Sequence, residues 1–290
     1  MKEWNEKFGY EPNMENIDKT LSNIQNNLAN WATPHYMESC IGYTDLTSLK
    51  SEDTPSKIIA FTQKVNDLKA TYPDYPAPAS ICVYPNFSKI VKETLTVPGV
   101  DITTVAGCFP SSQSFPEIKR MECKMAVQNG ANEIDIVLAL NAFLDSDYSR
   151  ASKEIKEIKS DLGDNIILKV ILETGALSTP EKIAAASFVS MEAGADFIKT
   201  STGKQEPAAT PMAAIVMCQC IKEYYNKTGK MIGFKAAGGI ATTKDALCYL
   251  AIVDTILGKQ WLNPRYFRLG ASRLINNLLS ELQQKTITFF

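Results

Sequence analysis

The segment GADFIKTSTGK, residues 194–204, decides the fold, because it sets a lysine inside a short apolar run with the composition of a β-strand. The segments IILKVILE (166–173) and MIGFKAA (231–237) show the same pattern, with Lys169 and Lys235 near their centres. Nearly continuous apolar runs are typical of parallel strands that are covered on both faces. We therefore predict three consecutive buried strands, each with a lysine inside it.

On both sides of these strands, short β-rich runs alternate with longer helical patterns. The eight predicted strands lie at 39–46, 80–85, 101–107, 133–140, 166–173, 196–201, 231–237 and 266–272. Helices are predicted from Pro55 onward and at 115–128, 148–162, 180–193, 211–226 and 243–250. This alternation fits a doubly wound sheet or a closed barrel. The count of eight and the polar residues within strands favour a (β/α)8 TIM barrel, whose active site would lie at the C-terminal ends of the strands.

Residues 1–37 are predicted to form an N-terminal helical extension, followed by the barrel domain at 38–290. Asn16 or Asp18 is the expected N-cap of a helix that runs to about Asn30. Its apolar residues recur at spacings of three and four and form one stripe, made of Ile17, Leu21, Ile24 and Leu28. We expect this stripe to pack across one end of the barrel.

The composition argues against several classes of function. The 290 residues carry a net charge of −2 without a long basic run, so no nucleic-acid partner is expected. The polar N-terminus lacks the apolar core of a signal peptide, and no apolar run reaches about 18 residues, so we expect a cytoplasmic protein that does not bind membranes. Seven scattered cysteines and a single histidine, His35, argue against a disulfide framework and a zinc site, and we expect no metal.

Charged residues inside the apolar strands are the main functional signal. Lys169, Lys199 and Lys235 lie on three successive strands, and Asp135 lies in the strand EIDIVLAL. An unpaired charge in a dry interior is costly, so such groups pair or shift their pKa. If the strands are in phase, all these side chains face one lumen. A single lysine would more often extend to a strand end, and a buried structural network remains the alternative to a catalytic site.

GADFIKTSTGK, GFKAAGG, EIDIV and LKVILETG together resemble deoxyribose-phosphate aldolase, a family of class I aldolases with a (β/α)8 barrel. The segments TDLTSL (44–49) and SICVYP (80–85) match it as well, and the similarity runs from about Gly42 to Ser272. The resemblance implies cleavage of 2-deoxy-D-ribose 5-phosphate, a small sugar phosphate, to acetaldehyde and D-glyceraldehyde 3-phosphate without a cofactor. A homodimer or another homo-oligomer is left open.

The resemblance also implies roles for individual residues. Lys199 matches the Schiff-base lysine, Lys235 the second active-site lysine, and Asp135 the proton-relay aspartate. Asp45 and Lys169 match polar residues that line the same site. For Cys82, which matches a cysteine near the substrate pocket, a buried structural thiol is the simpler role.

Electrostatics supports the assignment of the two lysines. A lysine attacks a carbonyl only as the free amine, and the usual lysine pKa of about 10.4 leaves almost none of it near neutral pH. A second ammonium about 4 Å away costs on the order of 4 kcal/mol at an effective dielectric of about 20, which corresponds to about 3 pKa units. Lys235 would thus activate Lys199, while Asp135 would hold Lys235 charged and relay protons.

Donors for a phosphate are expected where three strands end. Glycine lets backbone N–H groups approach a ligand closely, and loops after the seventh and eighth strands commonly bind phosphate in this fold. The predicted substrate-binding residues there are Thr202, Gly203, Lys204, Gly238, Gly239, Gly270 and Ser272.

The chain departs from the family's pattern at four places. Ala241 stands where the family often has an arginine, and Arg273 where it often has a second serine. Arg273 either restores the lost charge or faces solvent. Cys108 in AGCFP (106–110) replaces an asparagine, and the chain ends in TITFF, where some members carry a tail with a terminal tyrosine. These changes bear on substrate preference and rate more than on imine chemistry.

Two other functions are compatible with these residues. The first is a lysine-dependent aldolase that uses a different aldehyde acceptor, which assays on a panel of sugars would detect. The second is a catalytically silent sugar-phosphate binding protein, although binding alone does not require Lys199, Lys235 and Asp135 together. Trapping an imine with borohydride would distinguish an aldolase from a binding protein.

Overall fold

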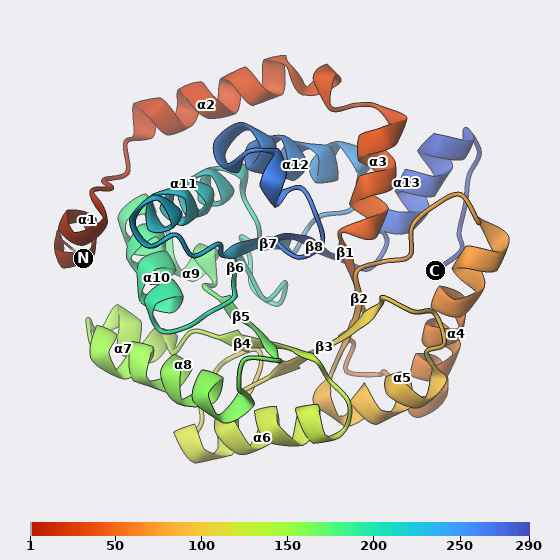
Figure 1. Cartoon of the computed structure of the whole chain (residues 1–290), viewed down its shortest axis with the longest axis horizontal. Helices are drawn as coiled ribbons and strands as arrows, with labels where there is room; N and C mark the ends of the chain where they lie inside the picture. Colours follow the sequence, from red (N-terminus) through yellow and green to blue (C-terminus); the bar gives the residue numbers. More distant parts are fainter. Residues whose placement is uncertain (1) are drawn as a thin grey trace.

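The computed structural model describes residues 2–290, which form a closed barrel of parallel strands surrounded by helices (Figure 1). The strands are β1 (Thr44–Thr47), β2 (Ser80–Val83), β3 (Asp101–Ala106), β4 (Glu133–Val137), β5 (Ile167–Ile171), β6 (Phe197–Lys199), β7 (Gly233–Ala237) and β8 (Phe267–Ala271). They follow one another in chain order, and β8 closes the barrel against β1. The predicted (β/α)8 barrel is confirmed.

A main helix follows each strand and packs on the outside of the barrel. These helices are α4 (Pro55–Thr71), α5 (Ser88–Thr94), α6 (Pro116–Gln128), α8 (Tyr148–Leu162), α10 (Pro180–Glu192), α11 (Pro211–Thr228), α12 (Thr243–Leu257) and α13 (Leu274–Gln283). Two short helices, α7 (Leu140–Leu144) and α9 (Thr174–Leu177), begin close to the ends of β4 and β5. Thr54, Thr179 and Thr210 each cap a helix that starts at the following proline, so a Thr-Pro pair fixes the start of each of these three helices. Among the described residues, no helix has the length and apolar character needed to cross a bilayer.

The strand predicted at 39–46 is wrong in its first half. Residues Pro34–Gly42 form the helix α3, and β1 begins only at Thr44. Thr33 caps this helix with its side chain, and Pro34 occupies its first turn. The buried residues of α3 recur at helical spacing and are Met37, Cys40 and Ile41. The expected domain boundary falls inside this helix, which connects the N-terminal segment to the barrel.

The N-terminal segment lies along the side of the barrel. It contains α1 (Lys2–Phe8) and α2 (Met14–Asn26), and the N-cap of α2 is Asn13, upstream of both expected caps. Ile17 and Ile24 of the predicted stripe are fully buried. The helix α2 runs along the outer faces of α11 and α12 instead of across a barrel end (Figure 1). The segment thus adds a partial second layer to the helical ring.

The strand register decides which charged residues share a level in the lumen. Lys169 pairs with Asp135 across β4 and β5, and Lys199 pairs with Lys235 across β6 and β7. Lys235 in turn lies opposite Arg268 on β8. Because side chains alternate between the two faces of a strand, residues opposite one another point to the same side. The lysines are therefore in phase, and all of them are buried.

Candidate active site

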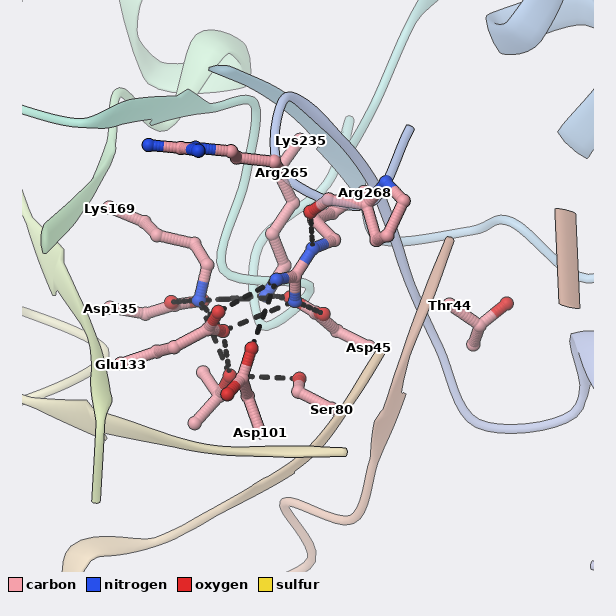
Figure 2. A network of polar contacts seen from close by, with 12 residues as sticks. Thr44, Asp45, Ser80, Asp101, Glu133, Asp135, Lys169, Lys235, Arg265 and Arg268 are labelled. Atoms are coloured by element: carbon pink, nitrogen blue, oxygen red, sulfur yellow. Dashed lines mark hydrogen bonds and ion pairs between the residues drawn. The ribbon is translucent and has the colours of Figure 1, made fainter. Parts of the chain in front are cut away.

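Polar side chains from all eight strands converge inside the barrel, and Figure 2 shows much of this network. Charged members that are at most 3% exposed are Asp45, Glu133, Asp135, Lys169, Lys199, Lys235 and Arg268. Charges in such a dry place persist only when they are paired and hydrogen-bonded. The cluster satisfies this condition, since each of these side chains takes part in at least one ion pair.

Asp135 on β4 is the centre of the cluster, because all three lysines contact it. Its Oδ2 accepts hydrogen bonds from the Nζ atoms of Lys199 and Lys235, each at 2.8 Å. Its Oδ1 accepts a hydrogen bond from Lys169 at 3.1 Å. Burial raises the pKa of Asp135, but the three ammonium groups lower it more, and the net pKa lies well below the usual value. Asp135 is therefore a carboxylate across the physiological range.

Lys199 and Lys235 have pKa values shifted in opposite directions. For Lys199, burial and then the charge of Lys235 lower the pKa against the opposing effect of Asp135, and the net pKa is lowered. Burial also lowers the pKa of Lys235, but the carboxylates of Asp135 and Asp45 outweigh it, and the net pKa is raised. The sequence had attributed the activation of Lys199 to Lys235 alone, whereas burial is the larger cause. Of these two lysines, Lys199 is the one that can supply a free amine.

Two further charged residues of the cluster were not predicted. Glu133 accepts hydrogen bonds from Lys169 at 2.6 Å and from Thr103 at 2.6 Å. Arg268 donates to Asp45 at 2.6 Å and to Glu133 at 2.7 Å. Both are charged residues inside apolar strands, in EIDIV and FRLGA, so the signal that identified the lysines could have found them.

A cavity of about 410 Å³ opens at the C-terminal ends of the strands. Lys199 is the member of the charged cluster that reaches it, whereas Asp45, Asp135, Lys169 and Lys235 lie outside its lining. The loops after β1, β6, β7 and β8 form its walls. All predicted phosphate donors line it, namely Thr202, Gly203, Lys204, Gly238, Gly239, Gly270 and Ser272, and so do Ala241 and Arg273.

The loops after β6 and β7 are in close contact beside this cavity. Gly238 has a φ of 90°, and a Cβ atom there would lie 2.7 Å from the Cβ of Ala208 and 3.1 Å from the Cα of Gly203. Glycine is therefore required at this position. Thr202 donates its hydroxyl and its backbone N–H to the carboxylate of Glu173, at 2.5 and 3.2 Å, which ties the β6 loop to the end of β5.

The side chain of Lys204 crosses the cavity mouth. Its Nζ donates a hydrogen bond to the backbone carbonyl of Leu49 in the loop after β1. An ammonium held by one neutral carbonyl can exchange this contact for a charged ligand oxygen, because charge-assisted hydrogen bonds are the stronger ones. Its place at the mouth is compatible with the predicted role in phosphate binding.

The two cysteines singled out in the sequence take no part in the cavity lining. Cys82 is buried in a small apolar cluster with Leu49 and Val105, and burial raises the pKa of its thiol. This fits the structural role that the sequence favoured. The backbone N–H of Cys108 donates to Glu122 at 2.7 Å, away from the cavity. All seven cysteines are free, and no group of three or more His, Cys, Asp or Glu side chains in residues 2–290 is arranged to hold a metal ion.

The C-terminal residues pack on the outside of the barrel. Asn276 accepts hydrogen bonds from the backbone N–H groups of Phe289 and Phe290, at 3.0 and 2.9 Å. The two rings lie against Tyr72 and Phe61, which flank the outer side of α4. The chain end therefore does not contribute to the cavity in this structure.

Comparison with known proteins agrees with this architecture. Residues 40–255 match the family model described as DeoC/LacD family aldolase. A Caenorhabditis elegans protein assigned as a deoxyribose-phosphate aldolase is 41% identical over 270 residues, which cover 92% of this chain and 88% of that protein.

Solved structures give the same fold. A Coccidioides immitis protein assigned as a deoxyribose-phosphate aldolase has 28% identity and a TM-score of 0.68, over 90% of this chain and 95% of its own. The deoxyribose phosphate aldolase from Aeropyrum pernix, described as a tetramer, has 23% identity and a TM-score of 0.64, over 93% of this chain and 98% of its own.

Proposed function

The chain belongs to the DeoC/LacD aldolase family, and on this premise we propose that it cleaves 2-deoxy-D-ribose 5-phosphate through an imine on Lys199. The observation that carries the proposal is the position of Lys199. It is the charged-cluster residue that lines the cavity, and its pKa is lowered. A buried amine that reaches the cavity is placed to attack an aldehyde carbonyl.

The reaction begins when the free amine of Lys199 adds to the C1 aldehyde of the open-chain sugar. Loss of water from this adduct leaves a protonated imine. A base then takes the proton of the C3 hydroxyl, the C2–C3 bond breaks, and its electron pair neutralises the imine as an enamine. D-glyceraldehyde 3-phosphate leaves at this step. Protonation of the enamine at C2 and hydrolysis of the imine release acetaldehyde and regenerate Lys199.

The neighbours of Lys199 are suited to moving these protons. Asp135 accepts hydrogen bonds from both Lys199 and Lys235, so a proton can pass between the amine and the second lysine through one carboxylate or an intervening water. Lys235 keeps its proton at rest because Asp45 and Asp135 raise its pKa against burial. It thus supplies a fixed positive charge beside the imine and an acid for the return step.

Trapping the imine tests the proposal. Acetaldehyde and borohydride should leave a two-carbon adduct on Lys199, detected by peptide mass spectrometry, and Lys199→Met should abolish it. The exposed lysine variant Lys153→Met on α8 is the matched control. An adduct confined to Lys235 or Lys169 would contradict the assignment. No adduct at all would favour the silent sugar-phosphate binding protein, and trapping without cleavage of the deoxy sugar phosphate would favour another acceptor.

We further propose that the chain pairs with a second copy through α6. Large apolar side chains that are more than half exposed follow one face at the start and along the length of this helix: Phe115, Ile118, Met121 and Met125. Glu117 and Lys124 lie beside this stripe, and Lys124 also forms an ion pair with Asp161 at 3.1 Å. In an antiparallel pair of these helices about a two-fold axis, each Glu117 would meet the partner's Lys124, so the face is complementary to itself.

A further inference from the structure

All three nitrogen atoms of the Arg268 guanidinium donate hydrogen bonds. Its Nη1 donates to Asp45, its Nη2 donates to Glu133, and its Nε donates to the backbone carbonyl of Pro264. The carboxylate of Asp101 lies 3.6 Å from Nη2. The side chain is 3% exposed, and these contacts orient its planar guanidinium.

Two chains of ion pairs lead from Arg268 to the proposed nucleophile. In the first, Asp45 bonds Arg268 through Oδ1 and lies with Oδ2 at 2.5 Å from Lys235. In the second, Glu133 bonds Arg268 and contacts Lys169 at 2.6 Å. Both lysines donate hydrogen bonds to Asp135 (Figure 2). Asp135 also accepts a hydrogen bond from Lys199. Arg268 does not line the cavity above Lys199, so it can act on the reaction only through these neighbours.

The formal charges of this cluster depend on Lys199. Three fully buried carboxylates, on Asp45, Glu133 and Asp135, face four basic groups, on Lys169, Lys199, Lys235 and Arg268. The charges sum to zero when Lys199 is a free amine and to +1 when it is protonated. An excess charge is unfavourable in a place with little access to water. Without Arg268 the preference reverses, because protonated Lys199 would then give the neutral cluster.

We propose that Arg268 is a positioning residue whose permanent positive charge, held by Asp45 and Glu133, keeps Lys199 in its uncharged form. An arginine suits this role better than a lysine, since its guanidinium stays protonated at every relevant pH and bonds two carboxylates at once. The inference rests on the proposed imine chemistry of Lys199 and adds the residue that sets its charge state.

Charged or titratable groups lie on all the strands around Lys199, and the sign of the charge that is removed sets the sign of the expected change. The titratable or charged groups on these strands are Asp45 on β1, Cys82 on β2, Asp101 at the start of β3, Glu133 and Asp135 on β4, Lys169 on β5, Lys235 on β7 and Arg268 on β8. In the loops at the strand ends, Glu173 is bonded to Thr202, and Lys204 and Arg273 line the same cavity as Lys199. Cys82 stays a neutral thiol because burial raises its pKa. Asp101 is 37% exposed and partly screened by solvent. The fully buried groups therefore dominate.

The test is the pH dependence of imine trapping with acetaldehyde and borohydride. Arg268→Met should move the acidic limb of the trapping rate upward by about one pH unit, which means about tenfold less free amine below the limb. Glu133→Gln removes a negative charge with little change of shape and should move the limb downward. The double variant should return it to the wild-type position, and Arg268→Lys should restore it in part.

The outcomes separate this inference from the proposed function. If the wild-type protein forms no imine, the proposed function fails. If the wild type forms one and Arg268→Met lowers the rate equally at every pH, Arg268 is a structural residue and the inference is wrong. If Arg268→Met does not fold, as judged by circular dichroism, Glu133→Gln decides, because a limb that stays in place or moves upward refutes the charge argument.

Discussion

At the scale of the residue, one carboxylate controls the site. Asp135 shares its Oδ2 between Lys199 and Lys235, so the two ammonium groups compete for one oxygen. Active sites often place a group with a raised pKa, which serves as the acid, next to a group with a lowered pKa, which serves as the nucleophile. Lys199 is the more easily deprotonated of the two, since Lys235 has a second carboxylate in Asp45.

Removing Lys235 tests this competition. In Lys235→Leu, only Lys199 and Lys169 share Asp135, and one positive charge beside Lys199 is lost. The pKa of Lys199 should therefore rise, and turnover near neutral pH should fall on the order of 100-fold or more. The measurement is the pH profile of kcat/KM, with Lys153→Leu on the exposed face of α8 as the control. An unchanged profile would show that the two lysines are not coupled.

A substitution can also test whether Arg273 binds the substrate phosphate. It is exposed, lines the cavity beside Ala241, and makes no side-chain hydrogen bond or ion pair within the part of the chain that the structure describes. A guanidinium there can donate two hydrogen bonds to a phosphate. Such a contact is worth about 1.5–3 kcal/mol, so Arg273→Ser should raise KM for deoxyribose 5-phosphate roughly ten- to hundredfold.

The control for Arg273 is free deoxyribose, whose kcat/KM should stay the same in the variant. An unchanged KM for the phosphorylated sugar would mean that Arg273 faces solvent. The donors would then be Lys204 and the backbone N–H groups of the Gly238–Gly239 loop.

At the scale of the element, the strands carry the proposed nucleophile and the loops carry the candidate phosphate donors. Lys199 is the last residue of β6, and the Thr202–Lys204 turn follows it directly. Glu173, at the end of β5, accepts two hydrogen bonds from Thr202, so two neighbouring β–α connections are joined. This places an imine-forming amine and the candidate phosphate donors only a few residues apart on one connection.

The helix α6 gives a prediction about assembly. Met121→Glu places a charge in the exposed stripe and should shift the protein toward monomer, as measured by light scattering over a range of concentrations. Ile59→Glu on α4 is the matched control, because Ile59 is 47% exposed on another helix. A wild-type protein that is monomeric at all concentrations, or a Met121→Glu variant with the wild-type mass, would rule out this surface as the contact.

At the scale of the whole molecule, the charged interior should limit the pH range of stability. The folded-state pKa values of Asp45, Glu133 and Asp135 are lowered by the basic groups around them, although burial opposes this. Lowered carboxyl values add stability above the unfolded pKa of about 4, and this stability is lost as the pH falls below it. Lys169 and Lys235 have raised values, so their stabilisation is present below about pH 10.4 and is lost as the pH rises beyond it.

The Tm should therefore fall below about pH 5 and above about pH 10. The lowered pKa of Lys199 has the opposite sign to those of Lys169 and Lys235, so between these limits it makes the Tm decline as the pH falls from about 10.4. Glu133→Gln should flatten the acid side, because it removes one carboxyl whose protonation opposes folding. Thermal unfolding followed by circular dichroism at a series of pH values measures both effects. A Tm that stays level as the pH falls below about 4 would contradict this account of the buried cluster.

The sequence by itself determined the barrel, the three lysines, Asp135 and the loops that end the strands. It could do so because alternating strand and helix patterns are local, and because a charge within an apolar strand is conspicuous without any structure. The same local signal was present for Glu133 and Arg268. The role of these two residues depends on their contact with one another, and they lie 135 residues apart in the chain.

Only the tertiary structure decided the strand register, and with it which carboxylate each lysine meets. Residues 39–42 also required it, because their short apolar pattern fits a strand as well as a helix until the Thr33–Pro34 helix start and the packing of α3 choose the helix. The tertiary structure also decided that the pKa of Lys199 is lowered and that of Lys235 is raised. Burial and distance to Asp45 and Asp135 set those values, and both are properties of the closed barrel instead of the chain.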